Sequence, residues 1–421
     1  MRWRSRRRST PEHDDESPTP AHVRPLPDDE AEDGATPRDD GVAPDDNAGA
    51  EDAAAAEWLE AVAAAAVEQR WQEPQEDPAD APVDESGVGG EAHGPEERPE
   101  AALAAPVPPV PPAPAEVTEP AVDAGAVAAA ARDIVRRALA EDLDLAGDVT
   151  AEATVPPEAL GTARLVARAD GVAAGLELIA EVYDQLDPRV AVRLRSRDGD
   201  AVTAGQVLAE VEGPLRSVLT GERTALNLVT HLSGVATVTA RYVAAVADTG
   251  CAVRDTRKTT PGLRLLEKAA VRAGGGVNHR TGLSDALLVK DNHVAAAGGV
   301  APATRAALAG ARGRPVQIEV DSLEELEAAV AAGARDVLLD NFDVEQTRTA
   351  VARVRELERE HGRILLESSG GLDLETVRAY AQAGVDRIAV GALTHSAPQL
   401  DLALDLDAPV RHEHLAGGGS S

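Results

Sequence analysis

Residues 316–342 read VQIEVDSLEELEAAVAAGARDVLLDNF, and this stretch decides the predicted fold. Two short apolar runs, 316–320 and 337–339, flank a helical stretch at 323–332. A short strand, a helix and a second short strand are typical of a parallel βαβ unit. Acidic side chains close each run, with Glu319 in the first and Asp340 after the second. The stretch therefore predicts a parallel sheet that carries carboxylates at the carboxyl ends of its strands.

The same alternation continues on both sides of this unit. Further apolar runs lie at 252–254, 286–289, 364–366 and 387–390, and further helical stretches at 263–272, 303–309, 344–360 and 374–383. Polar or glycine-rich segments follow these runs. In an α/β barrel such loops converge on one face, whereas a doubly wound open sheet also collects ligand groups at its strand ends. We predict a TIM-like α/β barrel, complete or incomplete, over residues 235–396, with the doubly wound sheet as the alternative.

A smaller domain precedes the predicted barrel. Residues 121–234 contain apolar or alternating runs at 162–169, 190–195 and 206–211, separated by Gly, Asp and Pro turns. This pattern indicates a small α/β domain with mostly antiparallel strands. Helical periods occur at 126–143 and 217–247. After the barrel we expect a C-terminal helix and a flexible tail over residues 397–421.

Residues 1–120 differ in composition from the rest of the chain. They hold 30 acidic and 9 basic side chains and 19 of the 28 prolines. Acidic, proline-rich sequence with few apolar residues cannot bury enough apolar surface to fold, so we predict a disordered tail. The basic start is not followed by the apolar segment that a signal peptide needs. With a formal charge of -32, we expect a cytoplasmic protein that binds neither membrane nor nucleic acid.

The predicted strand ends carry three kinds of chemistry. Four cations follow the first strands, namely Arg257, Lys258, Arg280 and Lys290. They suit a small polyanion, because arginine binds carboxylate or phosphate bidentately. Glu319 and Asp340 are hard oxygen ligands suited to Mg²⁺. The glycine-rich segments 368–371 and 390–392 lie late in the series, where barrels bind phosphate. Together these groups indicate transfer of a phosphorylated group.

Nine stretches together resemble the quinolinate phosphoribosyltransferase family, also called nicotinate-nucleotide pyrophosphorylase (carboxylating). They match in order and spacing at 147–150 (GDVT), 221–234 (GERTALNLVTHLSG), 255–264 (DTRKTTPGLR), 270–280 (AVRAGGGVNHR), 290–293 (KDNH), 318–321 (IEVD), 338–342 (LLDNF), 367–372 (ESSGGL) and 389–396 (AVGALTHS). The resemblance implies an enzyme of NAD biosynthesis. Its substrates would be quinolinate and 5-phosphoribosyl 1-pyrophosphate, and its products nicotinate mononucleotide, pyrophosphate and carbon dioxide.

The resemblance also implies roles for single residues. The four cations would bind the quinolinate carboxylates, and Arg223 would reach the pocket of a neighbouring subunit, so we expect a homodimer or a higher homo-oligomer. Glu319 and Asp340 would hold Mg²⁺ and ribose hydroxyls. We expect further substrate contacts from Thr256, His279, Ser369, Gly370, Gly371, Val390, Gly391 and Ala392. The catalytic set would be Lys258, Lys290, Glu319 and Asp340.

Three alternatives to this function remain open from the sequence. A related phosphoribosyltransferase of the same fold would act on another aromatic acid. An aldolase would form a Schiff base at Lys290, which requires a desolvated amine. A non-enzymatic scaffold would need no charged groups at the strand ends, so the complete set of strand-end charges argues against it.

Overall fold

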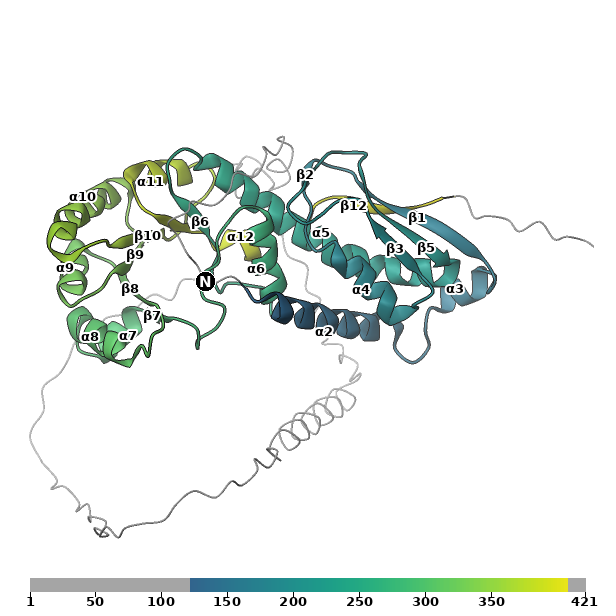
Figure 1. Ribbon diagram of the computed structural model, residues 1–421, viewed down its shortest axis with the longest axis horizontal. Helices are drawn as coiled ribbons and strands as arrows, with labels where there is room; N and C mark the ends of the chain where they lie inside the picture. The colour runs from purple at the N-terminus through teal and green to yellow at the C-terminus, as the bar shows by residue number, and fades with distance from the viewer. Residues whose placement is uncertain (1–121, 408–421) are drawn as a thin grey trace, which may run out of the picture. The chain divides into compact units, whose positions relative to one another are not determined.

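The computed structural model of the chain describes residues 122–407. The predicted tail at 1–120 and the end of the predicted C-terminal segment, 408–421, lie outside the described residues. Within the described part, the alternation of short strands and helices is present as an α/β fold (Figure 1).

Six short strands form one parallel sheet in the second half of the described chain. They are β6 Ala252–Arg254, β7 Leu287–Val289, β8 Val316–Val320, β9 Asp336–Asp340, β10 Leu365–Ser369 and β11 Arg387–Ala389, in the order β6-β11-β10-β9-β8-β7. Strands β7 to β11 follow one another in chain order, and the last of them pairs with β6, the first. A doubly wound sheet reverses its strand order at a switch point. Here β7 to β11 are added in one direction and β11 ends beside β6, an order that disfavours the doubly wound alternative.

Helices connect these strands and cover the sheet. They are α6 Arg264–Ala273, α7 Asp291–Ala296, α8 Val300–Gly310, α9 Leu323–Ala331, α10 Val344–His361, α11 Val377–Ala383 and α12 Ala392–His395. Ser322 caps α9 by accepting from the Glu325 N–H, and Asp343 caps α10 by accepting from the Gln346 N–H. Such caps satisfy N–H groups that have no partner inside the helix. The chain therefore has local signals for both helix starts.

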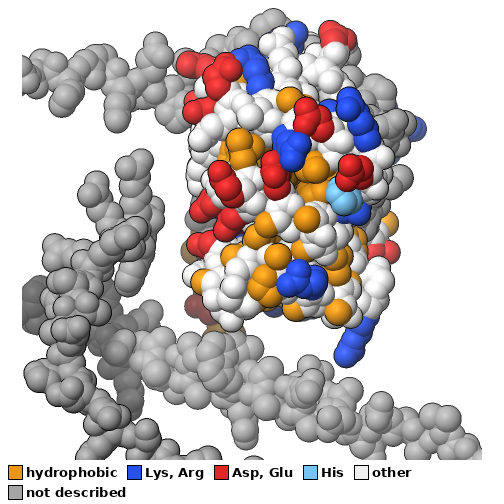
Figure 2. All heavy atoms as spheres, turned by 90° about the vertical axis from the view of Figure 1, so that its left-hand side faces the viewer, with side chains coloured by type: hydrophobic (Ala, Val, Ile, Leu, Met, Phe, Trp, Pro, Cys, Tyr) orange, Lys and Arg blue, Asp and Glu red, His pale blue; other side chains and the backbone are white. Residues whose placement is uncertain are grey.

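The outer face of the sheet domain carries mixed charges. Figure 2 shows acidic and basic side chains interspersed with apolar ones on the side of Figure 1 where α9 and α10 lie. Arg353 on α10 pairs with Glu327 on α9 and with Glu356 one turn further along α10. Exposed pairs of this kind contribute little stability.

A second, antiparallel sheet belongs to the smaller domain. Its strands are β1 Leu160–Ala167, β3 Ala191–Leu194, β5 Val207–Pro214 and β12 Leu402–Leu406, in the order β12-β1-β5-β3, and β2 Gly171–Val172 pairs separately with β4 Ala201–Val202. The helices α2 Ala124–Leu143, α3 Val149–Thr154, α4 Glu177–Leu186 and α5 Leu215–Ala245 accompany these strands. The predicted antiparallel strands at 162–169, 190–195 and 206–211 correspond to β1, β3 and β5.

Strand β12 corrects the prediction of a C-terminal helix at 397–421. It pairs antiparallel with β1, so that Leu404 lies opposite Leu165. The reason lies in the sequence LALDL, in which leucine alternates with another residue at every second position. A period of two is typical of a strand with one buried face. Over residues 397–407 the helix prediction was wrong, because it overlooked this alternation.

Helix α5 runs without interruption through Gly234, the residue at the predicted domain boundary. A Cβ atom at Gly234 would lie 2.1 Å from the carbonyl oxygen of Pro398, so only glycine lets the returning chain cross the helix here. α5 contacts β1 and β5 of the small domain and also β6 and α6 of the sheet domain. Although α5 has 31 residues, no helix within 122–407 is apolar enough over a sufficient length to cross a membrane.

Candidate functional site

One cavity of about 590 Å³ opens at the carboxyl ends of the parallel strands, and all six strands or the loops that follow them contribute to its wall. The predicted site residues that line it are Thr256, Arg257, Lys258, His279, Arg280, Lys290, Glu319, Asp340, Ser369, Gly370 and Gly371. Residues separated by more than a hundred positions therefore meet in one space. This placement confirms that successive strand ends converge, as the alternating pattern predicts.

Four predicted residues do not line this cavity. Val390 is buried in the core, and Ala392 begins the short helix α12. Gly391 lies directly behind the wall, because a Cβ atom there would be 3.0 Å from Cδ of Lys258. Arg223 is exposed on α5 and is absent from the lining.

The cavity also contains residues that the sequence reasoning missed, namely Leu288, Leu338, Asn341, Glu367 and Ala389. A signal for four of them was present. Leu288, Leu338, Glu367 and Ala389 each precede a predicted residue by two positions, and alternate residues of a strand point to the same face. Extending each strand-end prediction back by two residues finds them.

Positive charge dominates one side of the cavity. Within the described residues, Arg257, Lys258 and Arg280 form no ion pair with a carboxylate, and the Nε atoms of Arg257 and Arg280 are buried without a hydrogen-bond partner. Burial lowers the pKa of Arg280, and the positive charge of Arg257 lowers it further. Uncompensated cations held close together in a partly buried wall favour an anionic ligand.

Carboxylates face this group across the cavity. Lys290 Nζ donates to Glu319 Oε2 at 2.5 Å; 46% of the lysine side chain and 10% of the glutamate side chain are exposed. Burial raises the pKa of Asp340, although the charges of Lys290 and Lys258 oppose that shift. Asn341 Nδ2 donates to Asp340 Oδ2 at 2.7 Å and holds that carboxylate in place. One space therefore contains both anion-binding and cation-binding groups.

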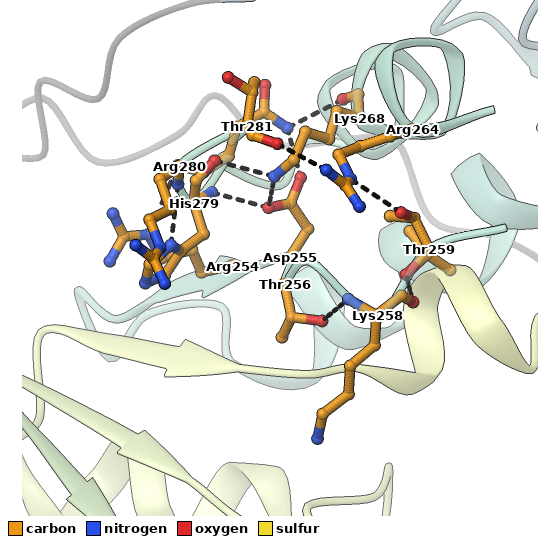
Figure 3. Close-up of polar contacts among 12 residues, drawn as sticks. Arg254, Asp255, Thr256, Lys258, Thr259, Arg264, Lys268, His279, Arg280 and Thr281 are labelled. Atoms are coloured by element: carbon orange, nitrogen blue, oxygen red, sulfur yellow. Dashed lines mark hydrogen bonds and ion pairs between the residues drawn. The ribbon is translucent and has the colours of Figure 1, made fainter. Parts of the chain in front are cut away.

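A buried ion pair fixes the loop that carries Thr256–Lys258. Figure 3 shows Asp255, Lys268 and His279 meeting while Lys258 points away from them. Asp255 accepts from Lys268 Nζ at 2.5 Å, from Asn278 Nδ2 at 2.6 Å and from the His279 N–H at 2.7 Å. Lys268 and Asp255 are both fully buried. Burial raises the pKa of Asp255 and lowers that of Lys268, and the attraction between the two charges opposes both shifts.

A second charged cluster lies inside the sheet beneath the cavity. Glu367 Oε2 accepts from Arg254 Nη1 at 2.5 Å and from Gln317 Nε2 at 2.9 Å, and it pairs with Arg387. Arg387 also pairs with Asp336. Burial would raise the pKa of Glu367, but the positive charges of Arg254 and Arg387 outweigh it and lower the pKa to about 2. Glu367 therefore stays ionised and orients its neighbours.

His279 is held as a wall residue of the cavity. Its Nε2 lies 2.9 Å from Gln317 Oε1, and its Nδ1 accepts from the Arg280 N–H at 2.8 Å. Burial, followed by the nearby charge of Arg254, lowers the pKa of His279 to about 4. Both nitrogens are occupied by protein partners, so this ring is unsuited to proton transfer.

The fold and this cavity define an α/β protein with a strand-end site for a small polyanion. The chain belongs to the quinolinate phosphoribosyl transferase family: residues 148–233 match the model of its N-terminal domain and residues 235–405 that of its C-terminal domain. Curated relatives agree. A nicotinate-nucleotide pyrophosphorylase (carboxylating) of Mycobacterium leprae is 52% identical over 279 residues, which cover 66% of this chain and 97% of that protein.

Two further comparisons support the assignment. A probable nicotinate-nucleotide pyrophosphorylase (carboxylating) of Bacillus subtilis is 40% identical over 261 residues, 62% of this chain and 88% of the relative. The solved structure of the nicotinate-nucleotide pyrophosphorylase from Francisella tularensis superposes with a TM-score of 0.62 at 40% identity. That match covers 66% of this chain and 96% of the other.

Proposed function

We propose that this chain transfers the phosphoribosyl group of 5-phosphoribosyl 1-pyrophosphate to quinolinate, with loss of carbon dioxide, and so forms nicotinate mononucleotide and pyrophosphate for NAD biosynthesis. The observation that carries the proposal is a relative 52% identical over nearly its full length. The cavity agrees with it, because a dianionic ring and a phosphorylated donor need cations and carboxylates in one space.

The cation side of the cavity suits quinolinate. Arg257, Lys258, Arg280 and Lys290 would hold its two carboxylates, with Thr256 and His279 beside the ring. Arg257 and Arg280 have free donors inside the wall, and charge-assisted bidentate bonds orient a planar acid. The pyridine nitrogen is already a nucleophile, so no general base is required. The phosphoribosyl transfer step thus needs no proton transfer from a side chain, which agrees with a His279 ring whose two nitrogens are both bonded to protein.

The other side suits the phosphoribosyl donor. Ser369 ends β10, Gly370 and Gly371 follow it, and Gly391 follows β11. We assign the 5-phosphate to these residues, with Val390 and Ala392 as neighbours. Gly370 and Gly371 have φ values of 112° and 62°, which favour glycine and let the backbone approach a ligand closely. Backbone N–H groups in such loops bind phosphate without a charged side chain.

Glu319 and Asp340 fit a magnesium ion that the substrate completes. They lie at the ends of the adjacent strands β8 and β9, and both line the cavity. Among residues 122–407, no group of three or more His, Cys, Asp or Glu forms a metal cage. Two carboxylates together with substrate oxygens and water are the usual Mg²⁺ environment. When bound, Mg²⁺ would supply positive charge for the departing pyrophosphate.

The catalytic set in this proposal is Lys258, Lys290, Glu319 and Asp340. Their task is to place the ring nitrogen in line with the anomeric carbon and to stabilise the leaving anion. Once the nitrogen carries the ribosyl group, its positive charge stabilises the carbanion left when the adjacent carboxylate departs as carbon dioxide, and that carbanion then takes a proton from water. The cations that bind the carboxylates orient the ring throughout.

We also propose an incomplete barrel that works as a homodimer or a higher oligomer. The strand order returns to its first strand but leaves an edge between β6 and β7, and side chains from all six strands still reach one cavity. Arg223 is exposed on α5 and does not line its own cavity. An arginine so placed is available to the cavity of a neighbouring subunit. A cytoplasmic location remains part of the proposal.

The aldolase alternative is disfavoured by Lys290 itself. Its amine lies in a half-exposed ion pair with Glu319, whereas a Schiff-base lysine needs a desolvated amine. Borohydride trapping with a carbonyl substrate checks this directly, and a trapped adduct at Lys290 would reopen that alternative.

The decisive experiment incubates purified protein with quinolinate, 5-phosphoribosyl 1-pyrophosphate and Mg²⁺ and follows nicotinate mononucleotide and carbon dioxide. Equal yields of both products are expected. Parallel reactions replace quinolinate with nicotinate or another aromatic acid. Turnover of a replacement in preference to quinolinate would favour the related phosphoribosyltransferase instead.

A further inference from the structure

We propose that Gln317 is a positioning residue that holds His279 as the Nε2–H tautomer and thereby fixes the backbone of Arg280 in the cavity wall. Gln317 lies on β8, two residues before Glu319, and is buried. The kinetic test of this role rests on the proposed function, whereas the spectroscopic test of the His279 tautomer needs no substrate.

The direction of the Gln317 amide is set by carboxylates. Its Nε2 lies 2.9 Å from Asp336 Oδ1 and 2.9 Å from Glu367 Oε2. Ionised carboxylates only accept hydrogen bonds, and Glu367 is kept ionised by Arg254 and Arg387. The amide therefore presents its NH₂ group to these two oxygens. Its carbonyl oxygen must then face the other way, toward His279.

The tautomer of His279 follows from that direction. Gln317 Oε1 can only accept, so His279 Nε2, 2.9 Å away, must carry a proton. The Arg280 backbone N–H can only donate, so His279 Nδ1, 2.8 Å away, must carry a lone pair. Both ring positions are thus decided by neighbours, and the imidazole is neutral. In histidine sites generally, the hydrogen bond made by one ring nitrogen determines whether the other nitrogen carries the proton.

The charges around the ring agree with a neutral imidazole. Arg254 on β6 and Lys268 on α6 disfavour a proton there, whereas Glu367 on β10 favours one, as does the hydrogen bond that the ring donates to Gln317 Oε1. Burial and the two cations prevail, and the pKa of His279 falls to about 4. Protonating the ring would also remove the acceptor for the Arg280 N–H.

The consequence concerns Arg280, a proposed carboxylate contact. Its side chain donates from Nη1 to Ala286 O at 3.1 Å, and within residues 122–407 its backbone N–H donates to His279 Nδ1. Losing the His279 acceptor should release the loop at Arg280 and weaken quinolinate binding. Turnover of bound substrate and binding of the phosphoribosyl donor should change little, because the loop released at Arg280 lies between α6 and β7 and carries none of the proposed donor contacts.

The first test measures the tautomer in the free enzyme by long-range ¹⁵N–¹H correlation of histidine side chains, with His279 assigned by its loss in His279→Gln. A proton on Nε2 and a lone pair on Nδ1, unchanged between about pH 6 and pH 8, supports the proposal. A proton on Nδ1, or an imidazolium at neutral pH, overturns it. This outcome does not depend on activity, so it is separate from failure of the proposed function.

The second test compares variants. Gln317→Met removes the acceptor opposite Nε2 and should raise the KM for quinolinate about tenfold, while kcat and the KM for the donor stay within about twofold. Gln206→Met, in the small domain, is the matched control for losing a glutamine hydrogen bond to Ser196. Equal KM values in Gln317→Met and wild type, with an unchanged histidine spectrum, would remove Gln317 from this role.

Discussion

Two lysine–carboxylate pairs have the same distance between Nζ and the carboxylate oxygen. Replacing the lysine by methionine should lower stability in one pair and catalysis in the other. Lys268 Nζ lies 2.5 Å from Asp255 with both side chains 0% exposed. Lys290 Nζ lies 2.5 Å from Glu319 with 46% of the lysine exposed. We predict that Lys268→Met destabilises the protein without direct loss of a substrate contact, whereas Lys290→Met damages catalysis and leaves stability nearly unchanged.

The magnitude follows from burial. Removing Lys268 leaves Asp255 charged in the interior, and breaking a buried pair in this way costs roughly 3–5 kcal/mol. In a folded unit of this size that corresponds to a Tm lower by roughly 6–10 °C. Asp255 keeps its bonds from Asn278 and the His279 N–H, which places the expected loss at the lower end. In the Lys290 pair the ammonium is half exposed to solvent, so this pair is closer to the surface pairs that contribute about 0–1 kcal/mol.

The pH dependence supplies a second check with a definite sign. Burial already raises the pKa of Asp255 in the folded protein, and losing Lys268 raises it further. A carboxyl group whose folded-state pKa lies above its unfolded value, about 4, destabilises the fold as pH rises from that value. The deficit of Lys268→Met should therefore be smaller at about pH 5 than at about pH 7.5.

Urea unfolding of wild type, both variants and Asp255→Asn combined with Lys268→Met measures these differences. The double variant removes both charges and should recover part of the loss. A deficit below about 1 kcal/mol for Lys268→Met, or one that grows on acidification, would refute the reasoning about the buried pair.

The other predictions concern the cavity and the ends of the chain. Arg257→Ala should raise the KM for quinolinate about tenfold or more, the loss of one charge-assisted contact, whereas Arg353→Ala on the outer face should leave steady-state kinetics unchanged. Gly370→Ala should weaken donor binding much more than Gly371→Ala, because a Cβ at Gly370 would lie 2.4 Å from Asn341 Oδ1 while one at Gly371 meets no atom within 4 Å; equal donor KM values would contradict this. Deleting residues 1–120 should leave kcat within about twofold, since the family match begins at residue 148; a collapse of kcat would place part of that segment in the catalytic unit.

Sequence periodicity predicted the parallel strands well because each is a short run of apolar residues between polar loops. The run 316–320 matches β8 at both ends, and Asp340 and Glu319 followed as cavity residues from strand-end position alone. Strand β12 was predicted as helix, although its alternating leucines contained the correct signal. The prediction gave more weight to the position of this segment near the end of the chain than to its five-residue alternation.

The interior charged cluster was beyond sequence reasoning for a different reason. Arg254, Glu367 and Arg387 lie in or beside predicted strands, where isolated charges usually indicate exposed positions. Their burial is possible only because strands far apart in the chain bring opposite charges within bonding distance. Gln317 illustrates the same limit, since its importance depends on three partners from three other segments.

The return of β12 to the first sheet has a consequence for synthesis on the ribosome. The edge of β1 receives its partner only after about 240 further residues are made, as the ion pair of Arg164 with Asp407 shows by its sequence separation of 243. Closing a chain segment of that length costs about 5 kcal/mol of entropy beyond a constant term. The small domain, although encoded first, must wait with an unpaired strand edge until the sheet domain has emerged, and such edges invite aggregation. Nascent chains released before residue 402 should therefore depend on chaperones more than full-length chains do.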